Sequence, residues 1–337
     1  MLQTAFTRLF GVRHPLMQAP MGGGIATPEL VAAVSNAGGL GMLAVGGLPA
    51  DAIRAQIRRT RQLTDQPFGA NLLLPMYLPG QAEVCIDERV AVLSLFWGEA
   101  RPHVAAAHAG GVKVMLQVGS VDEAKAARDA GVDVIVAQGV EAGGHVRGTV
   151  SGLVLVPCVV QAVHPLPVIA AGGIADGRGV AAMLALGAAG VALGTRLLAS
   201  EEAAAHPDYK QRILRARASD TLHTTLFDLG WADAPHRVLR NSVVADWEAA
   251  GCPPSGQRPH EGEIIGQAQF GDLAFPVSRY TALPPGAGFE GEVEKTALYA
   301  GESCELIDDV QPAGAIVANI ARDAETFIRR LPGDLCA

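Results

Sequence analysis

Eight short, mostly apolar runs recur between residues 15 and 200. Such runs fit strands buried on both faces, as in a parallel sheet covered by helices, better than strands with one face in water. Each run ends at a glycine or a polar turn, which favours strands over parts of longer helices. The predicted strands lie within residues 15–21, 39–46, 68–74, 91–98, 113–119, 132–139, 167–173 and 190–195.

Amphipathic segments rich in alanine follow most of these runs. Several open with Ser, Thr or Asp, which cap helix N-termini, and close at glycine. The pattern predicts helices within residues 27–38, 49–63, 101–111, 120–131, 152–163 and 176–187. Eight strand-helix units in about 200 residues match the size of a (β/α)8 TIM barrel. A doubly wound open sheet is the alternative, because strand order cannot be read from one sequence.

The alternation stops after Ser200. Residues 201–250 have a helical pattern, residues 251–292 are rich in Gly and Pro, and residues 312–331 predict a closing helix. We therefore expect a barrel over 1–200, a smaller, mostly helical cap or substrate domain over 201–295, and a segment over 296–337 that returns to the barrel. The large aromatic residues of the cap are expected in its core, with pocket walls as the alternative; they are Trp231, Trp247, Tyr280 and Phe289.

The composition of the chain argues against several classes of function. The 337 residues carry a net charge of -8 and no basic run, so nucleic acids and anionic membrane surfaces are poor partners. The long uncharged stretches are broken by Pro and Gly, and the N-terminus lacks the apolar core of a signal peptide. The five cysteines are scattered without metal-ligand spacing, which predicts a reduced, cytoplasmic protein without a metal site.

Glycines gather where strands are expected to end, which is where the active site of a β/α barrel lies. Two successive runs end in Gly172-Gly173 and Gly194-Thr195, whose backbone N–H groups could reach a phosphate. The alternative is that these glycines only permit tight turns. A dinucleotide motif over residues 39–44 fits poorly, because it lies inside a strand that follows a helix. A mononucleotide cofactor is therefore predicted.

A second cluster follows the sixth run and contains Glu141, Gly143, Gly144 and His145. Two glycines before a histidine let the backbone lie close to a planar ring while it presents an imidazole, the usual acid, base or donor near neutral pH. A loop histidine that caps a turn is the alternative. Glu141 is expected to anchor the loop rather than to take part in catalysis.

Several motifs together resemble the nitronate monooxygenase family, formerly called 2-nitropropane dioxygenases. The resemblance covers essentially the whole barrel and implies an FMN-dependent (β/α)8 barrel with a small second domain. It rests on QAPMGG (18–23), GANL (69–72), VMLQV (114–118), AQGVEAGGH (137–145), AAGGIADGRG (170–179) and LGTRLLAS (193–200), and more faintly on YAGES (299–303).

The resemblance also assigns roles to individual residues. It implies that Ala19, Pro20 and Met21 line the flavin ring, and that Asn71 and Gln117 hydrogen-bond its polar edge or ribityl chain. The implied phosphate site comprises Gly172, Gly173, Gly194 and Thr195, and Ala171 is a further residue implied to bind the cofactor. Gly143 and Gly144 would lie near the flavin, and His145 would be the catalytic histidine. Some relatives carry Lys where this chain has Gln117, which removes a cation near the flavin.

The leading hypothesis is oxidation of alkyl nitronates, or of nitroalkanes, by FMN and molecular oxygen to a carbonyl compound and nitrite. NAD(P)H-dependent reduction of quinones or enoyl thioesters is the alternative, and a flavin-binding scaffold is the non-catalytic one. An IMP-dehydrogenase-like reaction needs a nucleophilic cysteine, but Cys158 is expected in a helix core. A bulky residue at Gly173 or Gly194 is expected to weaken FMN binding and to leave the fold intact.

Overall fold

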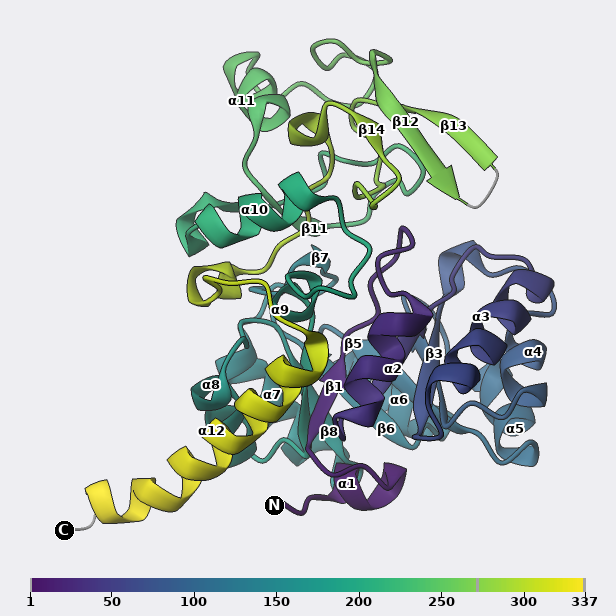
Figure 1. Cartoon of the computed structure of the whole chain (residues 1–337), viewed down its shortest axis with the longest axis vertical. Helices are drawn as coiled ribbons and strands as arrows, with labels where there is room; N and C mark the ends of the chain where they lie inside the picture. Colours follow the sequence, from purple (N-terminus) through teal and green to yellow (C-terminus); the bar gives the residue numbers. More distant parts are fainter. Residues whose placement is uncertain (1, 271–272, 336–337) are drawn as a thin grey trace.

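Eight parallel strands form a nearly closed barrel in this computed structural model, which describes residues 2–270 and 273–335 (Figure 1). The hydrogen-bonded order is β1-β9-β8-β6-β5-β4-β3-β2. A parallel bridge between Met17 and Leu40 joins the two end strands, so the open doubly wound sheet is excluded. The strands are β1 (Leu16–Gln18), β2 (Gly41–Ala44), β3 (Phe68–Leu73), β4 (Val92–Phe96), β5 (Lys113–Val118), β6 (Val134–Gln138), β8 (Val168–Ala171) and β9 (Gly190–Leu193). The predicted barrel is confirmed.

Helices cover the outside of the barrel and begin where polar side chains cap them. Thr27, Ser120 and Asp176 each accept a hydrogen bond from the backbone N–H three residues later. The covering helices are α2 (Pro28–Asn36), α3 (Ala50–Leu63), α4 (Gln81–Asp87), α5 (Arg101–Ala109), α6 (Val121–Ala130), α7 (Gly152–Val163) and α8 (Gly177–Ala185), with η1 (Leu74–Met76) before α4. Only α4 among these was not predicted from the sequence.

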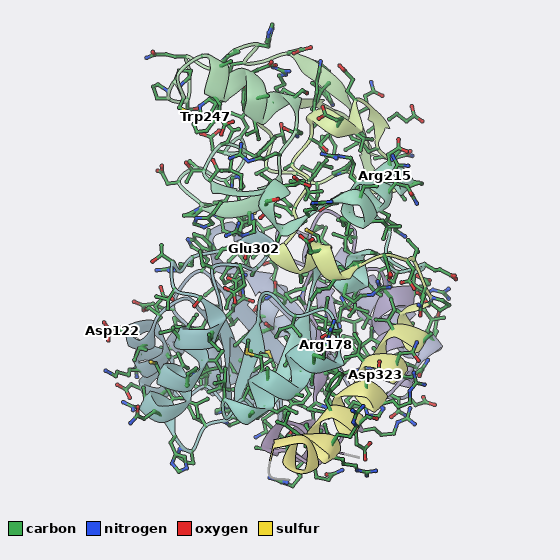
Figure 2. The ribbon with its side chains drawn as sticks, turned by 90° about the vertical axis from the view of Figure 1, so that its left-hand side faces the viewer. Asp122, Arg178, Arg215, Trp247, Glu302 and Asp323 are labelled. Atoms are coloured by element: carbon green, nitrogen blue, oxygen red, sulfur yellow. The ribbon has the colours of Figure 1, made fainter. Side chains whose placement is uncertain are left out.

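The C-terminal helix α12 (Ala313–Leu335) occupies the position of the eighth barrel helix. It packs against α8 and α2, between the last strand and the first. Figure 2 shows Asp323 of α12 beside Arg178 of α8. A Cβ on Gly177 would overlap the backbone at Asp323 and Ala324, so α8 approaches α12 closely.

The core has two main layers, one inside the barrel and one between strands and helices. The inner layer includes Met17, Met42, Met115 and Ile169. Helix α1 (Ala5–Phe10) contributes Phe6 and Phe10 to this layer, at the end where the strands begin. The bottom of the barrel is therefore filled, and the opposite end is left for a site.

Strands make up as large a part of the described cap as helices and 3-10 turns together, which corrects the prediction of a mostly helical cap. Its helices are α10 (Pro207–Arg215) and α11 (Ser242–Ala249), with the short turns η2 (Ala218–Asp220) and η3 (Val293–Lys295). One sheet joins β10 (Thr221–Thr224), β11 (His236–Leu239) and β7 (Gly144–His145), and the other joins β13 (Leu273–Ser278), β12 (Ile264–Phe270) and β14 (Glu290–Gly291). β10, β11 and β14 have two to four residues each, and Pro276 interrupts the strand pattern of β13, where proline is tolerated because β13 is an edge strand.

The aromatic residues of the cap do not all serve the same purpose. Tyr280 and Phe289 are buried, as predicted for a cap core. Trp247 is half-buried and packs against the same small cluster as Tyr280, far from the barrel (Figure 2). Trp231 instead lies against a residue of the barrel loops and belongs to the candidate site.

Two further observations concern the described residues. Cys158 lies on the exposed face of α7 rather than in its core, so that expectation was wrong. No described helix combines the length and apolar character needed to cross a membrane.

Candidate active site

The barrel brings the predicted strand-end residues together at one end. β1 pairs with β9, and a Cβ placed on Gly194 would lie 3.7 Å from Cβ of Ala19. β8 lies between β9 and β6, and Gly172 packs against the loop that follows β6, at Gly139 and Ala142. Pro20 and Met21 continue from Ala19 and are half-buried.

The turns after β8 and β9 present unused backbone donors. Within the described residues, the amides of Gly172, Gly173, Gly194 and Thr195 donate no hydrogen bond. The first three of these residues are half-buried, and space beside Gly194 is open apart from Ala19. Free amides on two neighbouring strand ends suit an anion such as phosphate.

The Thr195 side chain has a structural partner. Its hydroxyl accepts a hydrogen bond from Gly301 N at 3.0 Å, which ties the end of β9 to the segment before η4 (Glu302–Leu306). The next residue, Arg196, lies within the short helix α9 (Thr195–Leu198) and pairs with Asp309 at 3.0 Å. The Thr195 side chain and Arg196 therefore hold the returning chain, and the Thr195 backbone N–H is what remains for a ligand.

His145 is held by backbone pairing between barrel loop and cap. It lies in β7, directly opposite His236 of the antiparallel strand β11. Glu141 fixes the start of this loop, because its carboxylate accepts from Gly152 N at 2.9 Å at the start of α7. Arg237 of β11 donates to Val140 O at 2.9 Å. Glu141 is therefore a loop anchor, as expected.

The His145 imidazole lies in an aromatic cage. The ring of Trp231 stacks on it with centroids 4.0 Å apart, and His236, Tyr299 and Trp97 surround it at 5.4, 5.4 and 6.2 Å. Burial and the neighbouring His236 lower the pKa of His145 to about 3. Its Nε2 atom is buried and has no hydrogen-bond partner. The ring is therefore neutral near pH 7 and has one nitrogen available for a ligand.

His236 has a structural role rather than an acid-base one. Its Nδ1 lies 2.8 Å from Ala234 O, and its Nε2 accepts from Phe227 N at 3.2 Å. A ring that donates at Nδ1 and accepts at Nε2 is the neutral tautomer, and protonation would break the bond to Phe227. Burial also lowers the pKa of His236 to about 4.

Three amide side chains extend toward the same end of the barrel. Asn71 of β3 is buried and donates to Ser94 O at 3.2 Å. Gln117 of β5 is half-buried and has no side-chain hydrogen bond to the described residues. Gln138, at the end of β6, donates to His145 O at 3.0 Å, while its own Oε1 is buried without a partner. A buried acceptor and a buried ring nitrogen without partners in one place point to a missing polar ligand.

Sequence reasoning gave Trp97, Tyr299 and Gln138 no role in the site, and it placed Trp231 in the cap core with a pocket wall as the alternative. Trp97 and Gln138 stand at the ends of the fourth and sixth apolar runs, so strand-end position could have identified them. Trp97 also has a φ of 65°, a strained backbone for a bulky residue and a frequent feature of functional sites. Trp231 carries no such signal, because only the cap fold brings it to His145.

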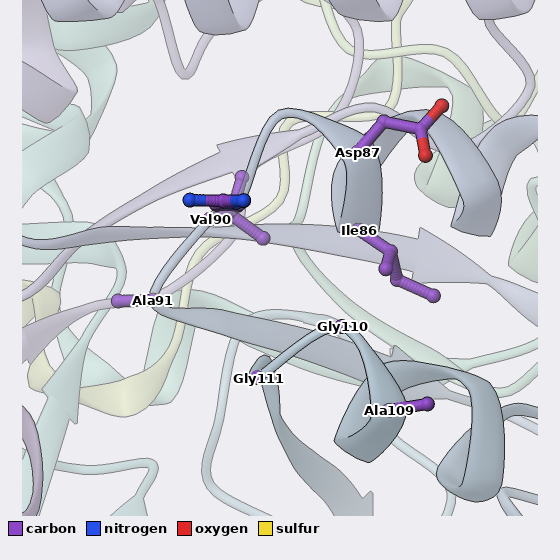
Figure 3. A pocket seen from close by; sticks show the side chains of 8 residues that line it. Ile86, Asp87, Val90, Ala91, Ala109, Gly110 and Gly111 are labelled. Carbon is purple, nitrogen blue, oxygen red and sulfur yellow. The ribbon is translucent and has the colours of Figure 1, made fainter.

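A separate hollow of about 620 Å³ lies at the other end of the barrel (Figure 3). It lies where β4 and β5 begin, lined by Ile86, Asp87, Arg89, Val90, Ala91, Ala109, Gly110 and Gly111. None of the strand-end residues contributes to it. Among the described residues there is also no group of three or more His, Cys, Asp or Glu side chains that could hold a metal ion.

Comparisons with known proteins identify the family of the chain. The family model of nitronate monooxygenases matches residues 3–84 and 76–323. A nitronate monooxygenase of Pseudomonas aeruginosa is 32% identical, over 94% of this chain and 98% of its own. The enzyme "(3aS,4S,5R,7aS)-5-hydroxy-7a-methyl-1-oxo-octahydro-1H-indene-4-carboxyl-CoA dehydrogenase" of Rhodococcus jostii is 40% identical, over 74% of this chain and 69% of its own. The structure of FabK from Thermotoga maritima matches with a TM-score of 0.84 and 33% identity, over 99% of this chain and 100% of that one. The chain is therefore a flavin-dependent oxidoreductase and belongs to the nitronate monooxygenase family.

Proposed function

We propose that the protein binds FMN and oxidises alkyl nitronates with molecular oxygen to a carbonyl compound and nitrite. The main observation behind this proposal is the neutral imidazole of His145, whose buried Nε2 lacks a partner beside strand ends that offer free amides. The family match supports the reaction class.

The described residues fit a mononucleotide flavin. The free amides of Gly172, Gly173, Gly194 and Thr195 would bind its phosphate. Around the isoalloxazine and ribityl groups we place an apolar rim, the backbone of the histidine loop and three amide side chains: Ala19, Pro20, Met21, Gly143, Gly144, Ala171, Asn71, Gln117 and Gln138. The unpartnered Oε1 of Gln138 would accept a hydrogen bond from the flavin. Bound FMN would supply the redox chemistry, taking electrons from the substrate and passing them to oxygen.

His145 would act as a base and then as a donor. A neutral imidazole can accept a proton at Nε2 from a nitroalkane carbon, provided that this nitrogen carries the lone pair. The resulting imidazolium would stay paired with the anionic nitronate, which offsets the cost of a buried cation. A preformed nitronate needs no proton removal and would instead be oriented by the neutral tautomer that carries its proton on Nε2 and donates it in a hydrogen bond.

A second function is favoured by one feature of the site. The side chains around His145 are aromatic rings and neutral amides, and Gln117 brings no positive charge. Such a pocket also suits a neutral carbonyl, as in NAD(P)H-dependent reduction of a quinone or an enoyl thioester. The likeness to the Rhodococcus jostii carboxyl-CoA dehydrogenase is consistent with a thioester substrate.

The test begins with the purified protein. Flavin released by denaturation should be FMN, and FAD or the absence of any bound flavin would contradict the phosphate site. Addition of a nitronate in air should consume oxygen and release nitrite. Activity only with NADH or NADPH and a quinone or enoyl thioester would favour the second function. If the protein binds FMN but catalyses neither reaction, its function is that of a flavin-binding scaffold.

A further inference from the structure

The cap supplies one aromatic side chain that contacts the candidate catalytic group directly. The Trp231 indole and the His145 imidazole are inclined by only 27°, with centroids 4.0 Å apart. The other rings around His145 are more steeply inclined and more distant, at 49° to 89°. One whole face of the imidazole is therefore covered by Trp231.

The backbone explains how this contact is maintained. β11 pairs His236 with His145, and Val146 N donates to Pro235 O at 2.8 Å just before that pair. The loop that carries Trp231 leads directly into this ladder, and Trp231 N itself donates to Asp228 O at 3.0 Å. The position of Trp231 is thus set by the same sheet that positions His145.

Trp97 closes the cage from the barrel side. Its ring meets Trp231 edge to face at 5.2 Å, so side chains from barrel and cap touch beside His145. The strained φ of Trp97 shows that the fold enforces this orientation. Outside the cage, Cζ of Arg147 lies 5.5 Å from the Trp97 ring centroid, and Arg147 pairs with Glu123.

We propose that Trp231 is a positioning residue, whose indole fixes the orientation of the His145 imidazole and keeps water away from it. The inference rests on the proposed function, because it assumes that His145 is the acid-base group. It also gives a residue of the cap a role in orienting the candidate catalytic group, in addition to closing the pocket.

The proposal has an electrostatic consequence. The titratable groups that face His145 are His236 from β11 and Tyr299 from the segment before η4, with Arg147 beyond Trp97. His236 is held in its neutral form by two hydrogen bonds, and burial raises the pKa of Tyr299, so neither stabilises an imidazolium. Exclusion of water is then the main reason for the lowered pKa of His145, and loss of Trp231 should raise it.

The test compares Trp231→Leu, Trp231→Phe and Trp247→Leu in the FMN-loaded protein. Trp247 is the matched control, because it is a cap tryptophan whose Nε1 donates to Pro253 O, away from His145. Histidine-labelled samples are titrated by NMR, with the His145 signal assigned through His145→Gln. The pH profile of kcat/KM for a nitroalkane is measured on the same samples.

In wild type we expect no titration of His145 down to about pH 5. Trp231→Leu should raise the pKa of His145 by about two units or more, which brings it into the measured range, and should move the acidic limb of the pH profile with it. Turnover should fall by about 10- to 100-fold because the imidazole is less well oriented. Trp231→Phe should keep the pKa of His145 and the turnover close to their wild-type values, and Trp247→Leu should change neither.

The proposal is overturned if Trp231→Leu resembles Trp247→Leu, with a lower melting temperature and an unchanged titration of His145. If Trp231→Leu fails to fold, Trp231→Met replaces it as the variant without an aromatic ring, and an unchanged pKa of His145 and an unchanged pH profile in Trp231→Met would also overturn the proposal. A shifted NMR titration in a protein without nitronate or nitroalkane turnover would reject the proposed function and leave the positioning role of Trp231 in place.

Discussion

Gly194→Ala is the sharpest perturbation of the proposed phosphate site. Gly194 has a φ of -99°, which any residue adopts, and an added Cβ would meet only Ala19 at 3.7 Å. The protein without flavin should therefore tolerate the change. With FMN bound, the new methyl group would stand in the space through which the amides reach the phosphate.

The expected size of the effect follows from the free amides. Moving the phosphate off one of these donors removes one charge-assisted hydrogen bond, which contributes about 1.5–3 kcal/mol. This corresponds to a rise of about 10- to 150-fold in the Kd for FMN. The larger side chain of Gly194→Val should weaken binding further.

The assay is titration of flavin-free protein with FMN, together with the melting temperature of each variant. Gly314→Ala is the control, because this glycine lies in α12 with its nearest atoms at 3.7 Å and 3.8 Å. It should leave the Kd unchanged. Wild-type affinity in a folded Gly194→Val protein would show that Gly194 only forms a turn and would refute the phosphate assignment.

Gly173 is less suitable for this test than the sequence suggested. It has a φ of +70°, and an added Cβ would lie 2.8 Å from Cγ of Glu141. A substitution there would strain the backbone and displace the anchor of the histidine loop, at a cost of about 1 kcal/mol or more. The prediction that a bulky substitution leaves the fold intact therefore remains for Gly194 and is withdrawn for Gly173.

Three further outcomes are expected. His145→Ala should retain FMN and lower nitroalkane turnover by about 10²–10⁴-fold, with a smaller loss for a preformed nitronate, as oxygen-uptake assays would show. Loss of FMN with unchanged turnover per bound flavin would make His145 a structural residue. The pKa of His236 is about 4 when folded and about 6.5 when unfolded, so the unfolded chain binds more protons below pH 6.5. Acidification from about pH 7 to about pH 5 should then lower the free energy of unfolding by about 2 kcal/mol through this residue, and urea unfolding should show a weaker pH dependence in His236→Gln. Glu141→Ala should lower the free energy of unfolding by about 0.5–2 kcal/mol, because the amide of Gly152 loses its cap; an unchanged unfolding midpoint would contradict the anchoring role.

The barrel was predictable because its signals are local. Each strand is a continuous apolar run, and caps such as Thr27, Ser120 and Asp176 stand directly before their helices. The cap was harder because its strands do not form continuous apolar runs: β10 reads Thr-Leu-His-Thr and β11 reads His-Arg-Val-Leu. Such strands are specified by their pairing with other segments, and their own sequence contains little periodicity.

The residues of the candidate site also differ in whether the sequence could predict them. Gly172, Gly194 and His145 follow apolar runs, so their strand-end position could be read from the sequence. The partners of His145 could not, because Trp231 and His236 lie more than eighty residues away and reach it through one antiparallel ladder. The neutral state of His145 is also a tertiary property, since burial and the facing His236 determine its pKa.

The most direct measurement is anaerobic mixing of the yellow, FMN-loaded protein with an alkyl nitronate and, in separate experiments, with NADH and NADPH. If the protein oxidises nitronates, the nitronate should bleach the flavin rapidly, and readmitted oxygen should restore the colour. Bleaching by NADH or NADPH alone, with no response to the nitronate, would contradict nitronate oxidation and assign the site to a reductase.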